Sequence, residues 1–223
     1  MPEDVTDSEV ELLDQAFDEL RAFAEEIQDR KTDSAWFANL LVCFLNATLR
    51  EYQNLRFAVG TSTALLSWSC RNLLELNIYV QHALMSEANA RRFVADGLID
   101  GIDILSGFKT WLARNDPALA LPALDDTLGR MAELRAQQDG GASKALALRG
   151  LAAEVGLADE YANVNALCAK LSRPTAYSVL AMNGEKELLL LRPTLFRAGA
   201  GHGLEIYQTV KGHVDVFGAE PKP

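Results

Sequence analysis

Almost every apolar stripe in this sequence repeats at intervals of three or four residues, which is the spacing of one face of an α-helix. The segment "EVELLDQAFDELRAFAEEI" shows this pattern, with apolar residues at Val10, Leu13, Phe17, Leu20 and Ile27 and acidic residues between them. Stretches that alternate between apolar and polar residues over a useful strand length do not occur in the sequence. The pattern therefore predicts an all-α chain that folds as a multi-helix bundle of about six to eight helices.

Residues that stop or turn a chain separate the helical segments. We expect helices over residues 6–30, 34–60, 62–84, 86–114, 122–138, 144–156, 158–172 and 202–217. The Asn183-Gly184 pair leaves two structures open for residues 179–192, a small hairpin or a loop that leads into a helix. The length fits one domain over residues 1–223, with flexible ends at 1–5 and 218–223.

The composition excludes several classes of protein. The net charge of −10 opposes general binding to DNA or RNA, because an acidic chain repels phosphate backbones. Cys43, Cys70 and Cys168 are far apart in the sequence and have no metal-ligand spacing. The acidic N-terminal stretch does not resemble a secretion signal, and no apolar run reaches the roughly 18 residues of a membrane span. We expect a cytoplasmic protein without a metal, a cofactor or a membrane contact.

The segment "SWSCRNLLELNIYVQH", residues 67–82, predicts a central helix that is apolar nearly all round, yet it contains Arg71, Glu75 and His82. At about 100° per residue, these three side chains share one face of the helix. A buried ion needs a partner, so two interpretations follow. Arg71 and Glu75 form a pair that fixes helix packing, with His82 at the solvent end of the helix, or the three residues line a polar pocket for an anion.

A second polar cluster, "LSRPTAY", lies at residues 171–177, where the helix over 158–172 must stop before Pro174. Its polar residues are Ser172, Arg173, Thr175 and Tyr177. They are consistent with ordinary capping of a helix end. The alternative is that Arg173 and Tyr177 border the same pocket as Arg71.

Two stretches, "RNLLEL" and about a hundred residues later "KLSRPTAYSV", resemble an uncharacterised family of bacterial all-helical proteins. That family is expected to have an Arg-x-x-x-Glu helix and a later segment Ser-x-x-x-His-Pro-(Thr/Ser). It is related to the HEPN-like group (higher eukaryote and prokaryote nucleotide-binding helical bundles), whose members include RNA-cleaving toxins and nucleotide-binding partners in defence and stress systems. The resemblance implies a helical bundle and makes ribonuclease activity one hypothesis.

The sequence departs from the catalytic pattern of that group, which is Arg, four to six residues, then His. Arg173 stands where a His would precede Pro174, and Arg71 is eleven residues from His82. Arg197 and His202 have the required spacing, but they lie in the glycine-rich stretch "RAGAGHG", which would hold a catalytic pair poorly. Because such chemistry needs a group that titrates near neutrality, the departures favour a protein without catalytic residues.

Our leading hypothesis from the sequence is a helical-bundle binding protein. Its ligand-binding residues would be Arg71, Glu75, His82, Ser172, Arg173 and Tyr177, and its partner a small anion, another protein or a second copy of the chain. A broad apolar face on the early helices is the expected dimer contact. The alternative is a HEPN-like ribonuclease or a nucleotide-binding component of a bacterial defence or toxin–antitoxin system.

Overall fold

A computed structural model describes residues 4–29, 35–115, 122–137, 146–173, 175–176 and 189–214. These residues contain helices and turns but no strand, which confirms the predicted all-α bundle. Most of the segment 179–192, where a hairpin or a loop was predicted, lies outside the described residues. So do residues 1–3 and 218–223 of the predicted flexible ends.

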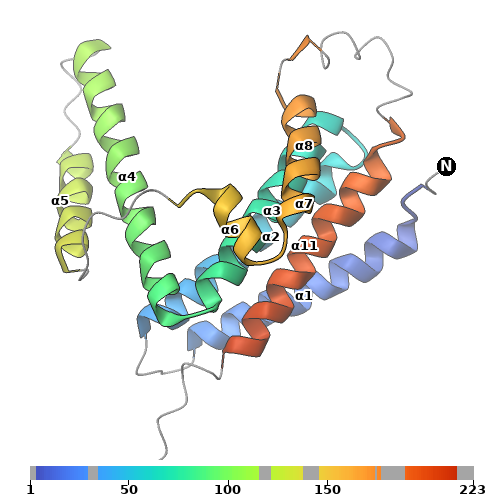
Figure 1. The fold of residues 1–223 in the computed structure, drawn as a ribbon, viewed down its shortest axis with the longest axis horizontal. Helices are drawn as coiled ribbons and strands as arrows, with labels where there is room; N and C mark the ends of the chain where they lie inside the picture. Colours follow the sequence, from blue (N-terminus) through green and yellow to red (C-terminus); the bar gives the residue numbers. More distant parts are fainter. Residues whose placement is uncertain are drawn as a thin grey trace, which may run out of the picture.

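Figure 1 shows the arrangement of the helices. Their bounds are α1 Asp7–Asp29, α2 Ala35–Ala58, α3 Thr63–Leu84, α4 Glu87–Asn115, α5 Pro122–Gln137, α6 Leu148–Glu154, α7 Ala158–Glu160, η1 Tyr161–Asn165, α8 Ala166–Leu171 and α11 Arg192–His213. The π-helical segment η1 joins α7 and α8 into one continuous helix. Over the described part of the chain, the number of helices agrees with the prediction.

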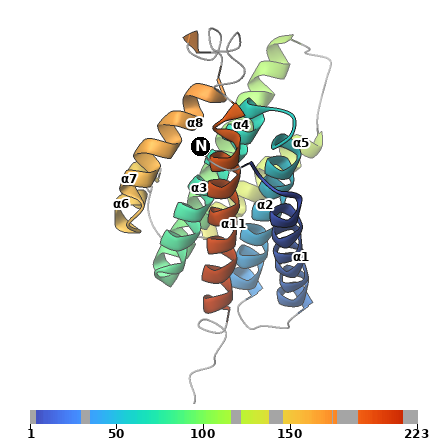
Figure 2. The same ribbon diagram turned by 90° about the vertical axis from the view of Figure 1, so that its right-hand side faces the viewer.

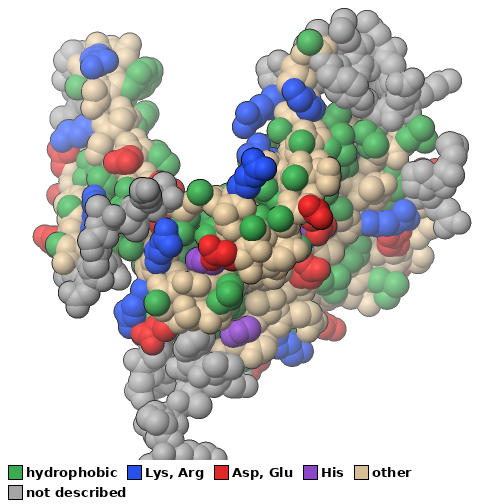
Figure 3. All heavy atoms as spheres, in the orientation of Figure 1, with side chains coloured by type: hydrophobic (Ala, Val, Ile, Leu, Met, Phe, Trp, Pro, Cys, Tyr) green, Lys and Arg blue, Asp and Glu red, His purple; other side chains and the backbone are tan. Residues whose placement is uncertain are grey.

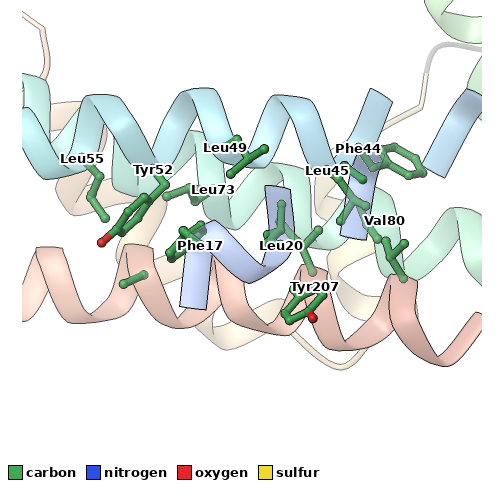
Figure 4. Close-up of a cluster of buried hydrophobic side chains, with 14 of the residues drawn as sticks. Phe17, Leu20, Phe44, Leu45, Leu49, Tyr52, Leu55, Leu73, Val80 and Tyr207 are labelled. Atoms are coloured by element: carbon green, nitrogen blue, oxygen red, sulfur yellow. The ribbon is translucent and has the colours of Figure 1, made fainter. Parts of the chain in front are cut away.

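The core lies between α1, α2, α3 and α11. Figure 2 shows α3 and α11 in the middle, with α1 and α2 on one side and α6 to α8 on the other. Large side chains from all four core helices meet there (Figure 4), and the rings of Phe17 and Tyr52 stack with their centroids 3.5 Å apart. Each fully buried large apolar side chain contributes roughly 1.5–3 kcal/mol, so this cluster holds the four helices together.

The helix α3 is the central element that its sequence predicts. It begins where Ser62 caps it, with the hydroxyl accepting a hydrogen bond from the Leu65 amide at 3.2 Å. Its buried side chains point in several directions, because α2, α11, α4, α6 and α8 all pack against it. Several polar residues on α3 therefore lie against a neighbouring helix, such as His82 beside Glu154 of α6.

The last helix begins ten residues before the predicted start at residue 202, because α11 starts at Arg192. The sequence was misleading here, since glycines at 199, 201 and 203 imitate a loop. A Cβ at Gly199 would lie 2.8 Å from Leu55 Cδ1, and one at Gly203 would lie 2.6 Å from Phe17 Cζ. These two glycines therefore let α11 pack closely against α1 and α2.

The chain turns between α6 and α7 at Gly156, as predicted. Gly156 has a φ of +78°, a conformation that favours glycine. The Leu157 amide donates to the Ala152 carbonyl at 2.7 Å, which closes the end of α6 in a Schellman arrangement. This turn directs α7, η1 and α8 back along α3.

The helices α4 and α5 form a projection that we call the arm, defined as residues 101–115 of α4 together with α5. The earlier part of α4 packs on the core through Phe93, whose ring lies 5.0 Å from that of Phe44 and 5.4 Å from that of Tyr79. Beyond that point the arm stands away from the other helices (Figure 1), and α5 packs on α4. None of the described helices is long and apolar enough to cross a membrane.

Candidate functional site

The first half of the predicted cluster is an ion pair on α3. Arg71 Nε donates to Glu75 Oε1 at 2.7 Å, and the two side chains are 23% and 22% exposed. The interpretation that Arg71 and Glu75 bond to each other is therefore confirmed, and both side chains are partly exposed. Most of this ion pair is shielded from bulk water, but one side of it remains accessible to a ligand.

The charge of Arg71 reaches the neighbouring helix α8. The pKa of the Cys168 thiol lies below its usual value, first because it accepts a hydrogen bond from the Cys70 thiol and also because of the positive charge of Arg71, while burial acts against both. Donation to Cys168 and burial raise the pKa of Cys70 far above its usual range. Arg71 thus lies at the junction of α3 and α8, where its positive charge acts on Cys168 while the negative charge of Glu160 acts on Cys70.

His82 lies apart from this pair. It is eleven residues further along α3, about 16 Å along the helix axis, and its Nε2 lies 3.2 Å from Glu154 Oε2 on α6. The expectation that His82 meets solvent at the helix end is wrong, because only 3% of it is exposed. The shared face on α3 exists, but α6 covers one end of it and α8 packs beside the other.

The second predicted cluster follows the end of α8. The Ser172 amide donates to the Cys168 carbonyl at 2.9 Å, and Thr175 Oγ1 donates to the Lys170 carbonyl at 3.0 Å, so part of the cluster does cap the helix. Ser172 is half-buried and Arg173 is exposed. Tyr177 lies outside the described residues. Since Cys168 adjoins Arg71, the end of α8 lies about one turn beyond the ion pair.

A buried polar network that the sequence analysis missed joins α3 to α11. The side chain of Asn77 is fully buried, and its Nδ2 donates to Glu205 Oε2 at 2.5 Å and lies 3.3 Å from His202 Nδ1. Gln81 Nε2 donates to Asn77 Oδ1 at 3.0 Å. The available sequence signal was Asn77 and Gln81 four residues apart in an otherwise apolar segment, on a face that Arg71 does not share.

His202 has an incompletely satisfied ring. Its Nε2 is buried and makes no hydrogen bond among the described residues, although Glu160 Oε1 on α7 lies 3.4 Å away. Arg197 lies on another side of α11, where its Nε and Nη2 donate to the two carboxylate oxygens of Glu9 at 2.7 and 2.9 Å. The residues Arg197 and His202 therefore have the sequence spacing of a catalytic pair but contact different helices.

A groove of about 390 Å³ opens between α1 and α2, on the opposite side of the α3–α11 layer from α8 (Figure 2). Polar side chains dominate its lining, which includes Arg21, Glu25, Gln28, Asn46, Arg50 and Gln53. Arg21 is already paired with Asp18 at 2.6 Å. Within the described ranges, no three His, Cys, Asp or Glu side chains are grouped in a way that could hold a metal ion.

Comparison with known proteins adds nothing to the description of this site. No protein-family model, no curated protein and no solved structure matches the chain. The resemblance to HEPN-like bundles therefore stays a prediction, and the functional argument rests on the geometry of the site.

Proposed function

We propose that this protein is a binding protein without catalytic activity, and that it holds an anionic small molecule or an anionic group of a partner at Arg71. The observation that carries the proposal is the Arg71–Glu75 pair, bonded at 2.7 Å and with each side chain less than one quarter exposed. A guanidinium fixed in this way offers planar donors to a carboxylate or phosphate at a small entropy cost.

The electrostatics at the α3–α8 junction support an anion. Arg71 contributes to the lowered pKa of Cys168 even though Glu75 is bonded to its Nε. A guanidinium with reduced access to water favours an anionic ligand over a cationic one. Figure 3 shows Lys and Arg side chains along the wall that α8 contributes on this side of the molecule.

An exposed aromatic ring supplies the apolar part of the proposed site. Trp68 is 43% exposed and lies three residues before Arg71 on the same side of α3. An indole beside a guanidinium provides a flat apolar surface next to a charged donor, which suits a ligand with both a ring or chain and an acidic group. Ser172 and Arg173 would complete this site from the end of α8, and Tyr177 remains a predicted member.

The surroundings of His82 and His202 support the proposal that the protein has no catalytic activity. Both His82 and His202 are buried, with Glu154 and Glu160 as their nearest carboxylates. Arg197, the candidate partner for His202 in a ribonuclease, is bound by both oxygens of Glu9. A general acid or base must reach the substrate, so these contacts favour binding over RNA cleavage.

The test is a thermal-shift screen of the purified protein against inorganic phosphate, citrate, short carboxylates and nucleotides. A ligand at a hundredfold excess over its Kd stabilises by about 2.7 kcal/mol, which raises the Tm of a chain of this size by roughly 5–10 °C. We expect such a shift for at least one anion, and we expect Arg71→Ala to abolish it. Arg21→Ala, which breaks an exposed ion pair with Asp18, is the matched control and retains the shift.

Three results would overturn the proposal. If no anion in the screen raises the Tm, or if Arg71→Ala responds like the wild type, Arg71 is not the anion site. If the purified protein cleaves mixed RNA and Arg71→Ala does not, the protein is an enzyme and the HEPN-like alternative takes its place.

A further inference from the structure

The arm carries an apolar stripe that faces no other described element. Ile104 is 69% exposed, Phe108 46% and Trp111 57%, and all three lie on one side of α4. Figure 3 shows hydrophobic side chains along the side of the arm that faces the hollow between the arm and α6 to α8. Aromatic and branched aliphatic side chains exposed together in one stripe are characteristic of a docking surface.

This stripe continues the face by which α4 packs on the core. Trp111 follows Phe93 by 18 residues, which is five full turns, so the two rings point to the same side of the helix. The ring of Phe93 contacts those of Phe44 and Tyr79. One continuous apolar face is thus buried over its first half and left open over its second half.

The charged residues at the two ends of the stripe are symmetric about Gly107, and two of its large apolar residues are offset by one position. Asp100 lies seven residues before this glycine and Arg114 seven residues after it, while Ile104 lies three before and Trp111 four after. Asp100 and Arg114 are both exposed, and a Cβ at Gly107 would meet nothing within 4 Å. When such a stripe is turned end over end, Asp100 faces Arg114 and Ile104 comes next to Trp111.

We propose that α4 pairs antiparallel with α4 of a second copy of this chain, across a two-fold axis at Gly107. Asp100 of each copy faces Arg114 of the other, Ile104 faces Thr110 next to Trp111, and Phe108 fills the space beside the partner's glycine. The absence of a side chain at Gly107 lets the two helices approach closely. A second copy fits better than an unrelated partner, because the pattern complements itself in position and in charge.

The base of the arm supplies a further reason for this orientation. Burial raises the pKa of Tyr79, and the nearby carboxylates Glu75, Asp96 and Asp100 raise it further. The base is therefore acidic, while the far end of α4 carries Arg114. An antiparallel partner brings its basic end to this acidic base, whereas a parallel partner would place like charges together.

A charge exchange tests the pairing. We expect sedimentation velocity over a concentration series to show a monomer–dimer equilibrium for the wild type. Asp100→Arg and Arg114→Asp each raise the dimer dissociation constant about tenfold or more, because the mismatch occurs twice in a two-fold interface. The double variant D100R/R114D returns the constant to near the wild-type value.

The recovery of the dimer in D100R/R114D cannot come from a contact between these two residues within one chain. Asp100 and Arg114 are fourteen residues apart, about 21 Å along α4, so they do not touch each other in a monomer. Ile104→Glu places a charge in the stripe and shifts the monomer–dimer equilibrium to monomer. Leu12→Glu, which places a charge on an exposed apolar residue of α1, is the control and leaves the equilibrium unchanged.

A cross-link reports the axis directly. In a Cys43→Ser background, Gly107→Cys forms a disulfide-linked dimer under mild oxidation, since the two copies of residue 107 meet at the axis. A wild type that stays monomeric at every concentration overturns the proposal. The proposal is also wrong if Ile104→Glu does not weaken the dimer, or if D100R/R114D does not restore it. Because none of these variants touches Arg71, failure here leaves the proposed anion site untouched.

Discussion

Asn77 on α3, which is fully buried, and Glu205 on α11, whose side chain is 57% exposed, are joined by a hydrogen bond of 2.5 Å at the edge of the α3–α11 contact. The same amide lies 3.3 Å from His202 Nδ1, and Gln81 binds its carbonyl oxygen. One fully buried side chain therefore satisfies polar groups from two helices. This bond fixes how α3 and α11 lie against each other along their length, because an apolar contact alone tolerates sliding.

Removing Asn77 destabilises the protein. We expect Asn77→Ala to lower the free energy of unfolding by about 1–3 kcal/mol, because it leaves a buried histidine and two further polar side chains without their partner. Urea denaturation monitored by circular dichroism measures the change. Asn163→Ala, which removes an exposed amide bonded to the Asp159 carbonyl, is the matched control and changes stability by less than about 0.5 kcal/mol. Equal effects of the two substitutions would contradict a structural role for the network.

The glycines of α11 predict opposite results at neighbouring positions. Gly203→Ala places a methyl group 2.6 Å from Phe17 Cζ, so we expect a loss of about 1–3 kcal/mol. At Gly201 an added Cβ meets nothing within 4 Å, so Gly201→Ala gains up to about 1 kcal/mol from helix propensity. Thermal unfolding of both variants gives the comparison. A stabilising Gly203→Ala would show that α11 and α1 are not in close contact.

Helical periodicity predicted the fold because each core helix shows its buried face in its own sequence. The stripe from Val10 to Ile27 is buried in α1, and the segment around Leu73 is buried on most sides, although Trp68 is 43% exposed. The start of α11 was not predictable in this way. Gly199 and Gly203 weaken a helix locally, and only the neighbouring Leu55 and Phe17 show why they are needed.

The candidate site could be predicted only in part. The bond between Arg71 and Glu75 follows from their spacing on one helix. Partners on other helices, such as Glu154 for His82 and Glu205 for Asn77, are far away in the sequence, and periodicity does not specify which helices meet. The same limit applies to the proposed contact with a second copy of the chain. The apolar faces of α1 and α2 that were expected to form it are buried in the core, and the open apolar stripe lies on α4 instead.

The contact between α1 and α11 predicts a dependence of stability on pH. Hydrogen bonds from Arg197 hold the pKa of Glu9 below its usual value of 4.5, and the charge of Arg197 adds to the effect. A carboxyl whose pKa is lower in the folded state stabilises the fold above its unfolded pKa, and this contribution is lost as the pH falls through the folded pKa. The stabilisation from the pair is therefore complete near pH 7 and disappears in the acid range below 4.5.

Glu9→Gln tests this dependence. We expect the variant to be less stable than the wild type by up to about 1 kcal/mol at pH 7, since the pair is partly exposed. The difference shrinks as the pH is lowered below 4.5 in a series of urea titrations. In the double variant with Arg197→Met, removal of Glu9 has little further effect at any pH. A difference that stays constant with pH would show that the ion pair contributes nothing.

The three thiols predict a simple labelling result. Cys43 is exposed on α2, whereas Cys70 and Cys168 are buried between α3 and α8. The hydrogen bond to Cys168 and burial together raise the pKa of Cys70, so its reactive thiolate form is scarce in the folded state. Cys168 carries a lowered pKa, but reagents cannot reach it without separation of α8 from α3. We expect a maleimide to label one thiol per native chain, none in Cys43→Ser, and all three in urea. Rapid labelling of Cys168 in the native protein would mean that α8 opens readily, and an anion bound at the neighbouring Arg71 should then slow that reaction.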